Sequence, residues 1–187
     1  EICREVEEEL RFPVFVKPSN AGSSCGVSKV ENQEALPLAV EKALQVDRRV
    51  LIEEFINGRE LECAVFSGVP GEVVASSVGE IKAAAEFYDY DAKYNNPDSK
   101  TELNPDLPSD VEEKIQKAAK SIFLAVDGFS LYRVDFFFTG EEIVFNEINT
   151  LPGFTSISMY PMLFEKAGWN IEELVEKLIA SAENRPS

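Results

Sequence analysis

The sequence has no histidine among its 187 residues. Without imidazole, the chain itself cannot form a Ser-His-Asp triad, an HExxH zinc site or a histidine acid–base pair. It has only three cysteines, Cys3, Cys25 and Cys63, which are far apart and form no CxxC pair. We therefore expect no disulfide framework and a cytoplasmic, reducing compartment. A thiol nucleophile would lack its usual base, so we interpret these residues as small buried or half-buried thiols.

Basic residues are also few, with 18 Lys and Arg against 34 Asp and Glu, for a net charge of −16. Nucleic acid and anionic membranes are poor partners for such a chain, because phosphate contacts need clustered basic side chains. No apolar run approaches the roughly 20 residues of a membrane span. Any anionic ligand must therefore be held by a few local donors.

Periodic apolar residues predict an α+β chain of mainly antiparallel hairpins with three or four helices. We expect strands at 12–17, 26–30, 50–55, 60–66, 72–76, 131–138 and 142–149. We expect helices at 1–10, 32–46, 109–126 and 170–182. The long irregular stretch 83–108 has the character of a functional loop.

Two of these helices have specific expected features. Ser109 and Glu112 have the spacing of a capping box, and the helix they open has the apolar positions Val111, Ile115, Ala118, Ile122 and Val126. In the last helix we expect inward-facing Ile171, Leu174, Val175, Leu178 and Ile179. A composition shift near Asn57-Gly58 predicts two lobes, 1–57 and 58–187, and a cleft between lobes is a common ligand site.

The most informative pattern is a pair of expected strands that carry acidic, basic and amide side chains. Arg133 and Asp135 lie on the first strand, and Glu147 and Asn149 lie on the second. With a three-residue turn, paired positions add to 280, so Arg133 faces Glu147. Asp135 and Glu147 are then diagonal neighbours on one face, about 7–8 Å apart. Two carboxylates and an amide can hold magnesium, which prefers oxygen ligands.

An alternative interpretation of this face is a solvated sheet surface with weak acid–base pairs. The same register puts Phe145 opposite Asp135 and places Phe137 and Ile143 on the acidic face. Acids among aromatic side chains need compensation by a metal or a salt bridge, which favours the metal site. Arg133 beside them can act as a positive fork for a developing oxyanion. A bulge that shifts the pairing by one residue would change this arrangement.

A second candidate site is the small polar loop 19–26 between the first two expected strands. Successive backbone N–H groups in such a loop can bind phosphate oxygens, and Lys17 precedes it as a point charge. It is not a Walker A loop, since no Gly-Lys-Ser/Thr follows. The stretch 53–60 could bind a nucleoside through its backbone edge and a carboxylate. Taken separately, each segment also fits an ordinary strand and turn.

Together these residues resemble the ATP-grasp enzymes, and specifically the D-alanine–D-alanine ligase family. The resemblance extends from about Phe12 to Ala182. Its matching stretches are 16–24, 53–62, 79–81, 87–94, 133–137 and 146–156. It implies an ATP-grasp fold in which ATP lies between two antiparallel sheets, with residues 1–57 as the remainder of the central lobe and 58–187 as the catalytic lobe.

The resemblance implies ATP and two magnesium ions as cofactors, with manganese as a substitute, and two D-alanines as substrates. The γ-phosphate of ATP passes to one D-alanine carboxylate, and the amine of the second D-alanine attacks the resulting acylphosphate. The dipeptide serves peptidoglycan precursor synthesis. The full-length protein is expected to be a cytoplasmic homodimer.

The family's functional residues carry over position by position. The implied ATP-binding residues are Lys17, Ser23, Ser24, Glu53, Glu54, Phe55, Glu60, Phe87, Lys93 and Asn146. The implied catalytic residues are Arg133, Ser23, Tyr94 and Gly153. Ser158, Lys93 and Arg133 are implied to bind substrate, and Asp135, Glu147 and Asn149 to bind metal.

The sequence also departs from the family pattern. Cys25 stands where valine is usual, and Tyr132 where a small residue is usual. The family's N-terminal domain and the start of its central domain are not in this sequence, so we expect the isolated polypeptide to be inactive or nearly so. Two alternatives are a ligase that uses D-serine as second substrate and a non-catalytic ATP-binding module. Tyr94, with no histidine in the chain, favours an amine as the second nucleophile.

Overall fold

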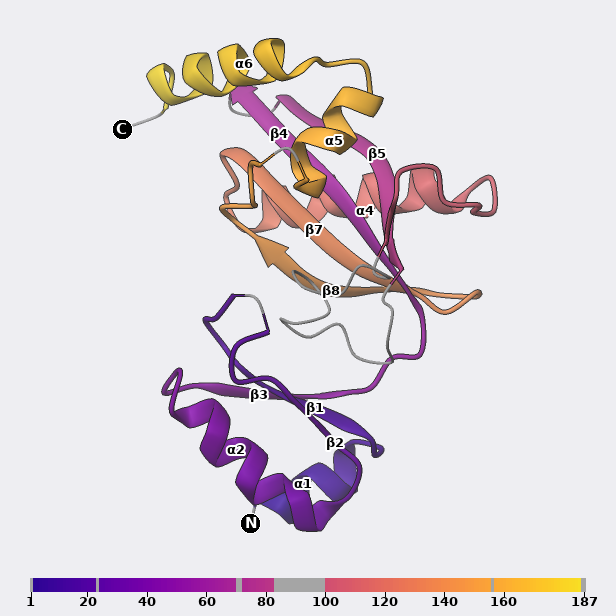
Figure 1. The fold of residues 1–187 in the computed structure, drawn as a ribbon, viewed down its shortest axis with the longest axis vertical. Coiled ribbons are helices and arrows are strands. Elements are labelled where there is room, and N and C mark those ends of the chain that lie inside the picture. The colour runs from indigo at the N-terminus through magenta and orange to yellow at the C-terminus, as the bar shows by residue number, and fades with distance from the viewer. Residues whose placement is uncertain (1, 23, 70–71, 83–99, 156, 186–187) are drawn as a thin grey trace. The chain divides into compact units, whose positions relative to one another are not determined.

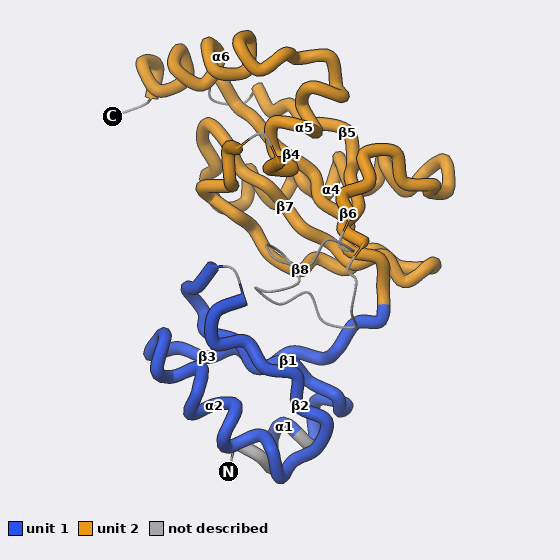
Figure 2. The backbone as a smooth tube through the Cα atoms, in the orientation of Figure 1, with its two compact units in different colours: residues 1–57, 83–99 blue, residues 58–82, 100–187 orange. Residues whose placement is uncertain are grey.

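The computed structural model describes residues 2–22, 24–69, 72–82, 100–155 and 157–185 (Figure 1). The chain forms two compact units (Figure 2). Among the described residues, the first unit ends at Asn57, and the second consists of Gly58–Lys82 and the residues from Lys100 onward. Along the described ranges, no helix combines the length and apolarity that a membrane span needs.

The first unit is a small antiparallel sheet covered by helices. Its strands are β1 (Val14–Pro18), β2 (Ser28–Val30) and β3 (Val50–Glu54), in the order β2-β1-β3. Its helices are α1 (Ile2–Glu9), the 3-10 turn η1 (Gln33–Ala35) and α2 (Leu36–Leu44). Their common core consists of Val6, Val14, Val16, Val30, Leu36, Ala39 and Ala43. The expected hairpin around the polar loop is confirmed by the pairing of β1 with β2.

The second unit is a five-stranded antiparallel sheet in the order β6-β5-β4-β7-β8. The strands are β4 (Arg59–Val69), β5 (Glu72–Lys82), β6 (Lys100–Glu102), β7 (Ser130–Phe138) and β8 (Ile143–Asn149). The helices are α4 (Val111–Ala125), α5 (Met159–Lys166) and α6 (Ile171–Glu183). The expected α+β class with antiparallel sheets is therefore confirmed, although β4 and β5 are longer than the hairpin we expected.

Helices cover both faces of this sheet, and the central strand β4 shows how the core is divided. Side chains alternate along a strand, so Leu61 and Cys63 pack under α4 while Ala64 and Phe66 pack under α5 and α6. Figure 1 shows α4 on the side of the sheet away from α5 and α6. Glu62 continues the face of Ala64 and Phe66 toward the start of β4.

Helix α4 begins differently from our expectation. Its N-cap is Asp110, which makes no side-chain capping bond among the described residues, so the capping box is wrong. Glu112 instead accepts a hydrogen bond from the backbone N–H of Val78 at 3.2 Å. The Glu112 carboxylate is therefore bonded to the sheet and does not form a capping box. The buried positions of α4 are Val111, Ile115, Ala119 and Phe123, whereas the expected Val126 is 48% exposed.

The inward face of α6 is narrower than expected. Leu174 is buried and Leu178 is partly buried against the same core. Ile171, Val175 and Ile179 are exposed, so their assignment as core residues was wrong. The sequence pattern spans a wide apolar arc of the helix, and only one edge of that arc meets the sheet.

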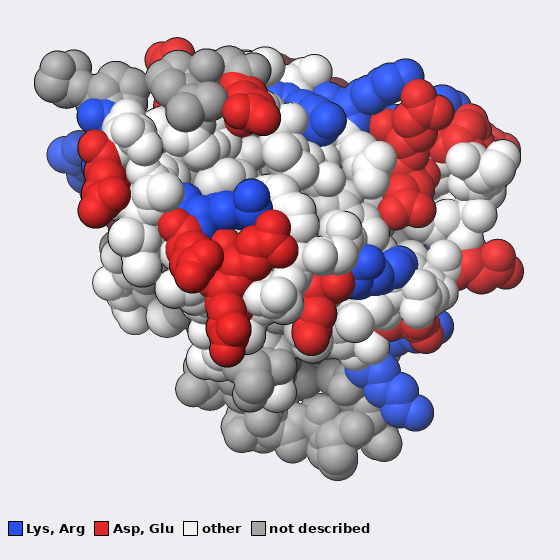
Figure 3. Space-filling model, turned by 90° about the horizontal axis from the view of Figure 1, so that it is seen from above, with Lys and Arg blue, Asp and Glu red and all other residues white. Residues whose placement is uncertain are grey.

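On the face shown in Figure 3, basic side chains lie between acidic ones and do not merge into one basic patch.

Helix α5 lies between the expected strand at 142–149 and the expected helix at 170–182, where we predicted no helix or strand. It is short, and most of its own residues are buried, namely Met159, Tyr160, Pro161, Leu163 and Phe164. Its phenol Tyr160 donates a hydrogen bond to the carbonyl of Val65 at 3.2 Å. A helix buried on several sides shows no amphipathic period, so the pattern did not indicate it.

Two of the three thiols can be described. Cys63 is fully buried, as expected, and Cys25 is exposed, which corrects the expectation for that residue. Burial raises the pKa of the Cys63 thiol to about 12. It therefore remains protonated and acts as a core residue.

Candidate functional site

The candidate site is built on the hairpin of β7 and β8, and its register differs from the expected one. Phe138 pairs with Ile143, one residue later than predicted. The connection is longer because the Thr139 Oγ1 accepts hydrogen bonds from the backbone N–H groups of Glu141 and Glu142, at 3.3 and 3.0 Å. A second shift follows between Asp135 and Phe136, where a bulge adds one residue on β8.

These two shifts place the acidic residues opposite each other. Asp135 pairs directly with Glu147, and Arg133 with Asn149, so the predicted diagonal arrangement and the Arg133–Glu147 pairing were wrong. All four side chains still share a face, because the two one-residue shifts add to two. Phe145 pairs with Phe136, which corrects its predicted position opposite Asp135.

The aromatic environment of the acids also changes. The Phe145 ring lies 6.3 Å from that of Phe136, a residue of the core under α4. Ile143 packs against the same core. Both therefore leave the acidic face, and of the three apolar residues expected there, alternation along β7 retains Phe137.

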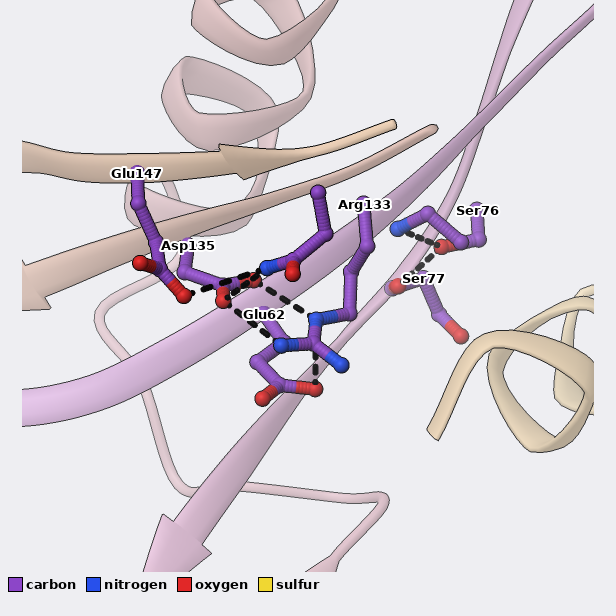
Figure 4. Close-up of polar contacts among 8 residues, drawn as sticks. Glu62, Ser76, Ser77, Arg133, Asp135 and Glu147 are labelled. Atoms are coloured by element: carbon purple, nitrogen blue, oxygen red, sulfur yellow. Dashed lines mark hydrogen bonds and ion pairs between the residues drawn. The ribbon is translucent and has the colours of Figure 1, made fainter. Parts of the chain in front are cut away.

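Strand β4 adds a third acid to the site. Glu62 pairs directly with Asp135 across β4 and β7, so Glu62, Asp135 and Glu147 form a row across three neighbouring strands. Glu62 and Asp135 are 3% and 1% exposed, whereas Glu147 is exposed. Figure 4 shows this row, with Arg133 reaching both Glu62 and Asp135.

Short polar contacts hold the row together. The Arg133 Nε and Nη2 donate to the Asp135 Oδ1 and Oδ2, each at 2.7 Å. The Arg133 Nε also lies 3.2 Å from the Glu62 Oε2. The Asn149 Nδ2 donates to the Asp135 Oδ2 at 3.0 Å and to the Glu147 Oε1 at 3.2 Å.

The electrostatics of this cluster favour a bound cation. Burial opposes the charge of Arg133, yet hydrogen bonds to Asp135 and the nearby charges of Asp135, Glu62 and Glu147 raise the pKa of its guanidinium. Three carboxylates therefore face one permanent cation, and the excess negative charge matches a divalent ion. Among the described residues, no three His, Cys, Asp or Glu side chains converge on one metal position. The available donors are two carboxylates and an amide, which suits magnesium because it completes its shell with water and phosphate.

The loop after β8 brings two predicted residues together. The Ser158 Oγ accepts from the backbone N–H of Thr155 at 3.0 Å and lies 2.9 Å from the Thr155 Oγ1. A Cβ at Gly153 would lie 2.9 Å from the Ser158 Oγ, so the two residues are in close contact. Asn146 lies on β8 between Phe145 and Glu147, and is half-buried. Glu60 lies on β4, where it pairs with Phe137.

The predicted nucleotide residues of the first unit lie on β1 and at the end of β3. The Lys17 Nζ makes an ion pair with the Glu53 Oε2 at 2.6 Å. The Glu54 Oε1 accepts a hydrogen bond from the backbone N–H of Arg11 at 3.1 Å. The Phe55 ring lies 4.7 Å from the Lys29 Nζ. The structure therefore brings Lys17 and Glu53 together, and it turns Glu54 toward the chain that enters β1.

The polar loop after β1 is closed by backbone turns. The N–H of Cys25 donates to the carbonyl of Gly22 at 3.1 Å, and the N–H of Val27 donates to that of Ser24 at 3.2 Å. Ser24 adopts a left-handed conformation with φ of 55°. Four predicted site residues, Ser23, Phe87, Lys93 and Tyr94, lie outside the described residues.

Glu62 is the residue of this cluster to which our sequence analysis gave no role. One signal was present, since Glu62 is an acid between the apolar residues Leu61 and Cys63. Its neighbours could not be inferred, because they depend on the pairing of β4 with β7, which are distant in sequence.

Comparisons with known proteins agree along most of the chain. Residues 1–180 match the family described as the D-ala D-ala ligase C-terminus. A D-alanine–D-alanine ligase of Acetivibrio thermocellus is 54% identical over 98% of this chain and 49% of its own length. One of Ruminiclostridium cellulolyticum is 49% identical over 99% and 50%. The chain thus spans about half the length of the curated relatives it matches.

Solved structures of related ligases also resemble the chain. The VanG D-Ala:D-Ser ligase of Enterococcus faecalis has a TM-score of 0.83 and 41% identity, and the match covers 95% of this chain and 52% of that one. The D-alanine–D-alanine ligase of Coxiella burnetii has a TM-score of 0.82 and 34% identity, with coverage of 98% and 48%.

Proposed function

The chain belongs to the D-alanine–D-alanine ligase family and has the ATP-grasp fold of its structural neighbours, and from this premise we propose that it is the ATP- and magnesium-binding portion of such a ligase. The whole protein joins two D-alanines to D-alanyl-D-alanine for peptidoglycan precursor synthesis. The observation that best supports this proposal is the direct pairing of Asp135 with Glu147, next to the pair formed by Arg133 and Asn149.

In this proposal two magnesium ions are held by Asp135, Glu147 and Asn149. When bound, the metal neutralises phosphate charge during phosphoryl transfer. Asn149 now directs its amide nitrogen at both carboxylates. To act as a ligand it must rotate its side chain so that its carbonyl oxygen faces the ion.

The basic and backbone groups beside the metal residues handle the negative charge that develops on substrate. Arg133 is permanently charged and its side chain is only 11% exposed, and with the N–H of Gly153 it stabilises the oxyanion. Ser158, in contact with Gly153, binds the carboxylate of the second D-alanine together with Lys93. The γ-phosphate of ATP would pass to the carboxylate of the first D-alanine and leave ADP. The amine of the second D-alanine would then attack the acylphosphate and release inorganic phosphate as the dipeptide forms. Ser23 and Tyr94 position the first D-alanine.

The proposed nucleotide-binding residues are those that the family resemblance implies. Lys17 and the backbone of Ser23 and Ser24 contact phosphates, and Glu60 binds the ribose. Adenine lies against the stretch 53–55. In support of the phosphate role, the Lys17 Nζ lies 2.6 Å from the Glu53 Oε2, beside the stretch proposed to bind adenine. Phe87, Lys93 and Asn146 complete the proposed nucleotide site.

D-alanine is favoured over D-serine as the second substrate. The two curated relatives at 54% and 49% identity are D-alanine–D-alanine ligases, whereas the D-Ala:D-Ser ligase structure is 41% identical. That the whole protein is a cytoplasmic homodimer without nucleic-acid or membrane partners stays a prediction from the resemblance and the net charge.

Calorimetric titration with Mg-ATP tests this function on the chain itself. We expect Glu147→Gln to weaken binding about tenfold, because it removes a charge from the metal donors. Glu141→Gln is the matched control, since Glu141 is an exposed acid in the connection of the same hairpin. Equal heats for the unaltered chain and Glu147→Gln would count against the metal assignment.

A further inference from the structure

Glu62 is a buried carboxylate that the proposed chemistry does not use. It lies on the central strand β4, is 3% exposed and directly opposes Asp135. Burying a carboxylate is costly unless a cation or hydrogen bonds compensate. Arg133 supplies a cation at 3.2 Å, and its side chain is itself only 11% exposed. The Glu62–Arg133 ion pair is therefore largely shielded from solvent on this face of the sheet.

Arg133 is held from two sides by carboxylates. Asp135 accepts from its Nε and Nη2, and Glu62 lies within reach of the same Nε. Asp135 accepts a third hydrogen bond from Asn149. An aspartate offers about four lone-pair sites in total, so Asp135 is nearly saturated by donors in this arrangement.

A cation at Asp135 must displace some of these donors. If Asp135 were the only carboxylate on Arg133, that displacement would leave a buried guanidinium without a counter-charge, which is strongly unfavourable. Glu62 removes this penalty because it stays beside Arg133 when Asp135 turns. Two carboxylates on one arginine thus allow one of them to exchange partners.

We propose that Glu62 is a positioning residue that retains Arg133 while Asp135 exchanges its hydrogen bonds for a divalent cation. The inference rests on the proposed function, since it takes Asp135 as a metal ligand. In this exchange Glu62 acts through its contact with Arg133 and contacts neither the metal nor the nucleotide.

Manganese binding in the presence of ATP, measured by electron paramagnetic resonance of the free ion, tests this role. We expect Glu62→Gln to raise the manganese dissociation constant about tenfold, as loss of a group that orients a metal ligand does. The side chain keeps its size but loses its charge, so Asp135 is left as the carboxylate that hydrogen-bonds Arg133, and Arg133 then competes with the ion for it.

Glu80→Gln is the matched control for a purely structural effect. Glu80 is also a buried acid of this sheet, 5% exposed and paired with an arginine, Arg59. It pairs with Leu61 and so lies on the opposite face of the sheet. Both variants lose a buried ion pair, and measurements below their unfolding temperatures isolate the effect on the ion. We expect Glu80→Gln to bind manganese like the unaltered chain.

Glu62→Asp tests whether the length of the side chain matters when its charge is kept. It keeps the carboxylate but shortens it by one methylene, so we expect it to remain defective. Full recovery of manganese affinity by Glu62→Asp would overturn the positioning role, and so would equal affinity of Glu62→Gln and the unaltered chain. Absence of manganese binding by the unaltered chain would instead overturn the metal site and this inference together.

A measurement on the unaltered chain covers the case in which Glu62→Gln does not fold. The Arg133 Nε–H resonance, assigned by its disappearance in Arg133→Lys, should exchange slowly with solvent. We expect slow exchange to persist after addition of Mg-ATP, since Glu62 still holds the group. Loss of protection on Mg-ATP binding would overturn the proposal.

Discussion

Arg59 and Glu80 form a two-pronged ion pair across β4 and β5, with Nε–Oε1 at 2.8 Å and Nη2–Oε2 at 2.7 Å. The Arg59 Nη1 also donates to the carbonyl of Asp106 at 2.6 Å. Arg59 is the first residue of β4, directly after Gly58, where the second unit begins. The pair therefore ties the start of the central strand to its neighbour and to the segment that leads into α4.

Loss of this pair should destabilise the second unit. We expect Glu80→Gln to lower the free energy of unfolding by about 1–2 kcal/mol, because it removes the charged partner of Arg59, whose side chain is 36% exposed and so stays partly hydrated. Urea unfolding followed by circular dichroism measures the change. Glu113→Gln is the control, since it removes an exposed pair with Lys117, and should leave the midpoint unchanged. Equal midpoints for the two variants would contradict the prediction.

The same pair should contribute to acid sensitivity. The hydrogen bond from Arg59 lowers the pKa of Glu80 below its ordinary value of 4.5, against the opposing effect of burial. A carboxyl whose pKa is lower in the folded state stabilises the fold above its unfolded-state pKa, and loses that contribution as pH falls through the folded-state value. Urea midpoints between about pH 6 and pH 3 should therefore fall less steeply for Glu80→Gln than for the unaltered chain. Parallel slopes would argue against this pair as a source of the pH dependence.

The two described thiols should react differently. Cys25 is exposed, and Cys63 is fully buried with a pKa raised to about 12. We expect Cys25→Ser to remove a fast phase of labelling by a disulfide reagent, and Cys63→Ser to leave that phase intact. Full labelling of Cys63 should require unfolding. A fast phase that disappears in Cys63→Ser would show that the β4 core opens readily.

Adjacent residues of α6 should differ in their contribution to stability. Leu174 is fully buried, while Val175 is 38% exposed. We expect Leu174→Ala to cost about 3 kcal/mol through lost burial and a cavity, and Val175→Ala to cost less than about 1 kcal/mol. Chemical unfolding of the two variants gives the comparison. A larger cost for Val175→Ala would mean that the exposed edge of α6 is the packed one.

A side chain at Gly79 should crowd the side chains of α5. A Cβ there would lie 2.9 Å from the Leu163 Cδ2 and the Met159 Sδ of α5. We expect Gly79→Ala to destabilise the chain by about 2 kcal/mol through overpacking. Gly22→Ala is the control, since nothing lies within 4 Å of a Cβ at that position. Thermal unfolding distinguishes them, and the prediction fails if both variants melt together.

The hairpin of the candidate site shows what local pattern predicts well. Alternation identified β7 and β8, and it placed Asp135 and Glu147 on one face. The register could not be predicted, because it depends on the Thr139 side chain in the turn and on a bulge near Asn146. Glu147 and Asn149 still share a face with Arg133 and Asp135, because the turn and the bulge each add one residue and together shift the register by two.

Other differences come from long-range packing. The role of Glu62 depends on the pairing of β4 with β7, which sequence spacing does not reveal. On α6, the apolar arc is wider than the surface that the sheet offers, so Ile171 and Ile179 remain outside. In both cases the local pattern limited the choices, and contacts between distant segments decided among them.

The bulge at Asn146 places two consecutive residues of β8, Asn146 and Glu147, opposite the single residue Asp135. If the strand were straightened here with every residue kept and the turn unchanged, Asn146 and Ile148 would come to the acidic face, and Glu147 and Asn149 would turn toward α4. This one irregularity therefore keeps the polar side chains of β8 in phase with those of β7.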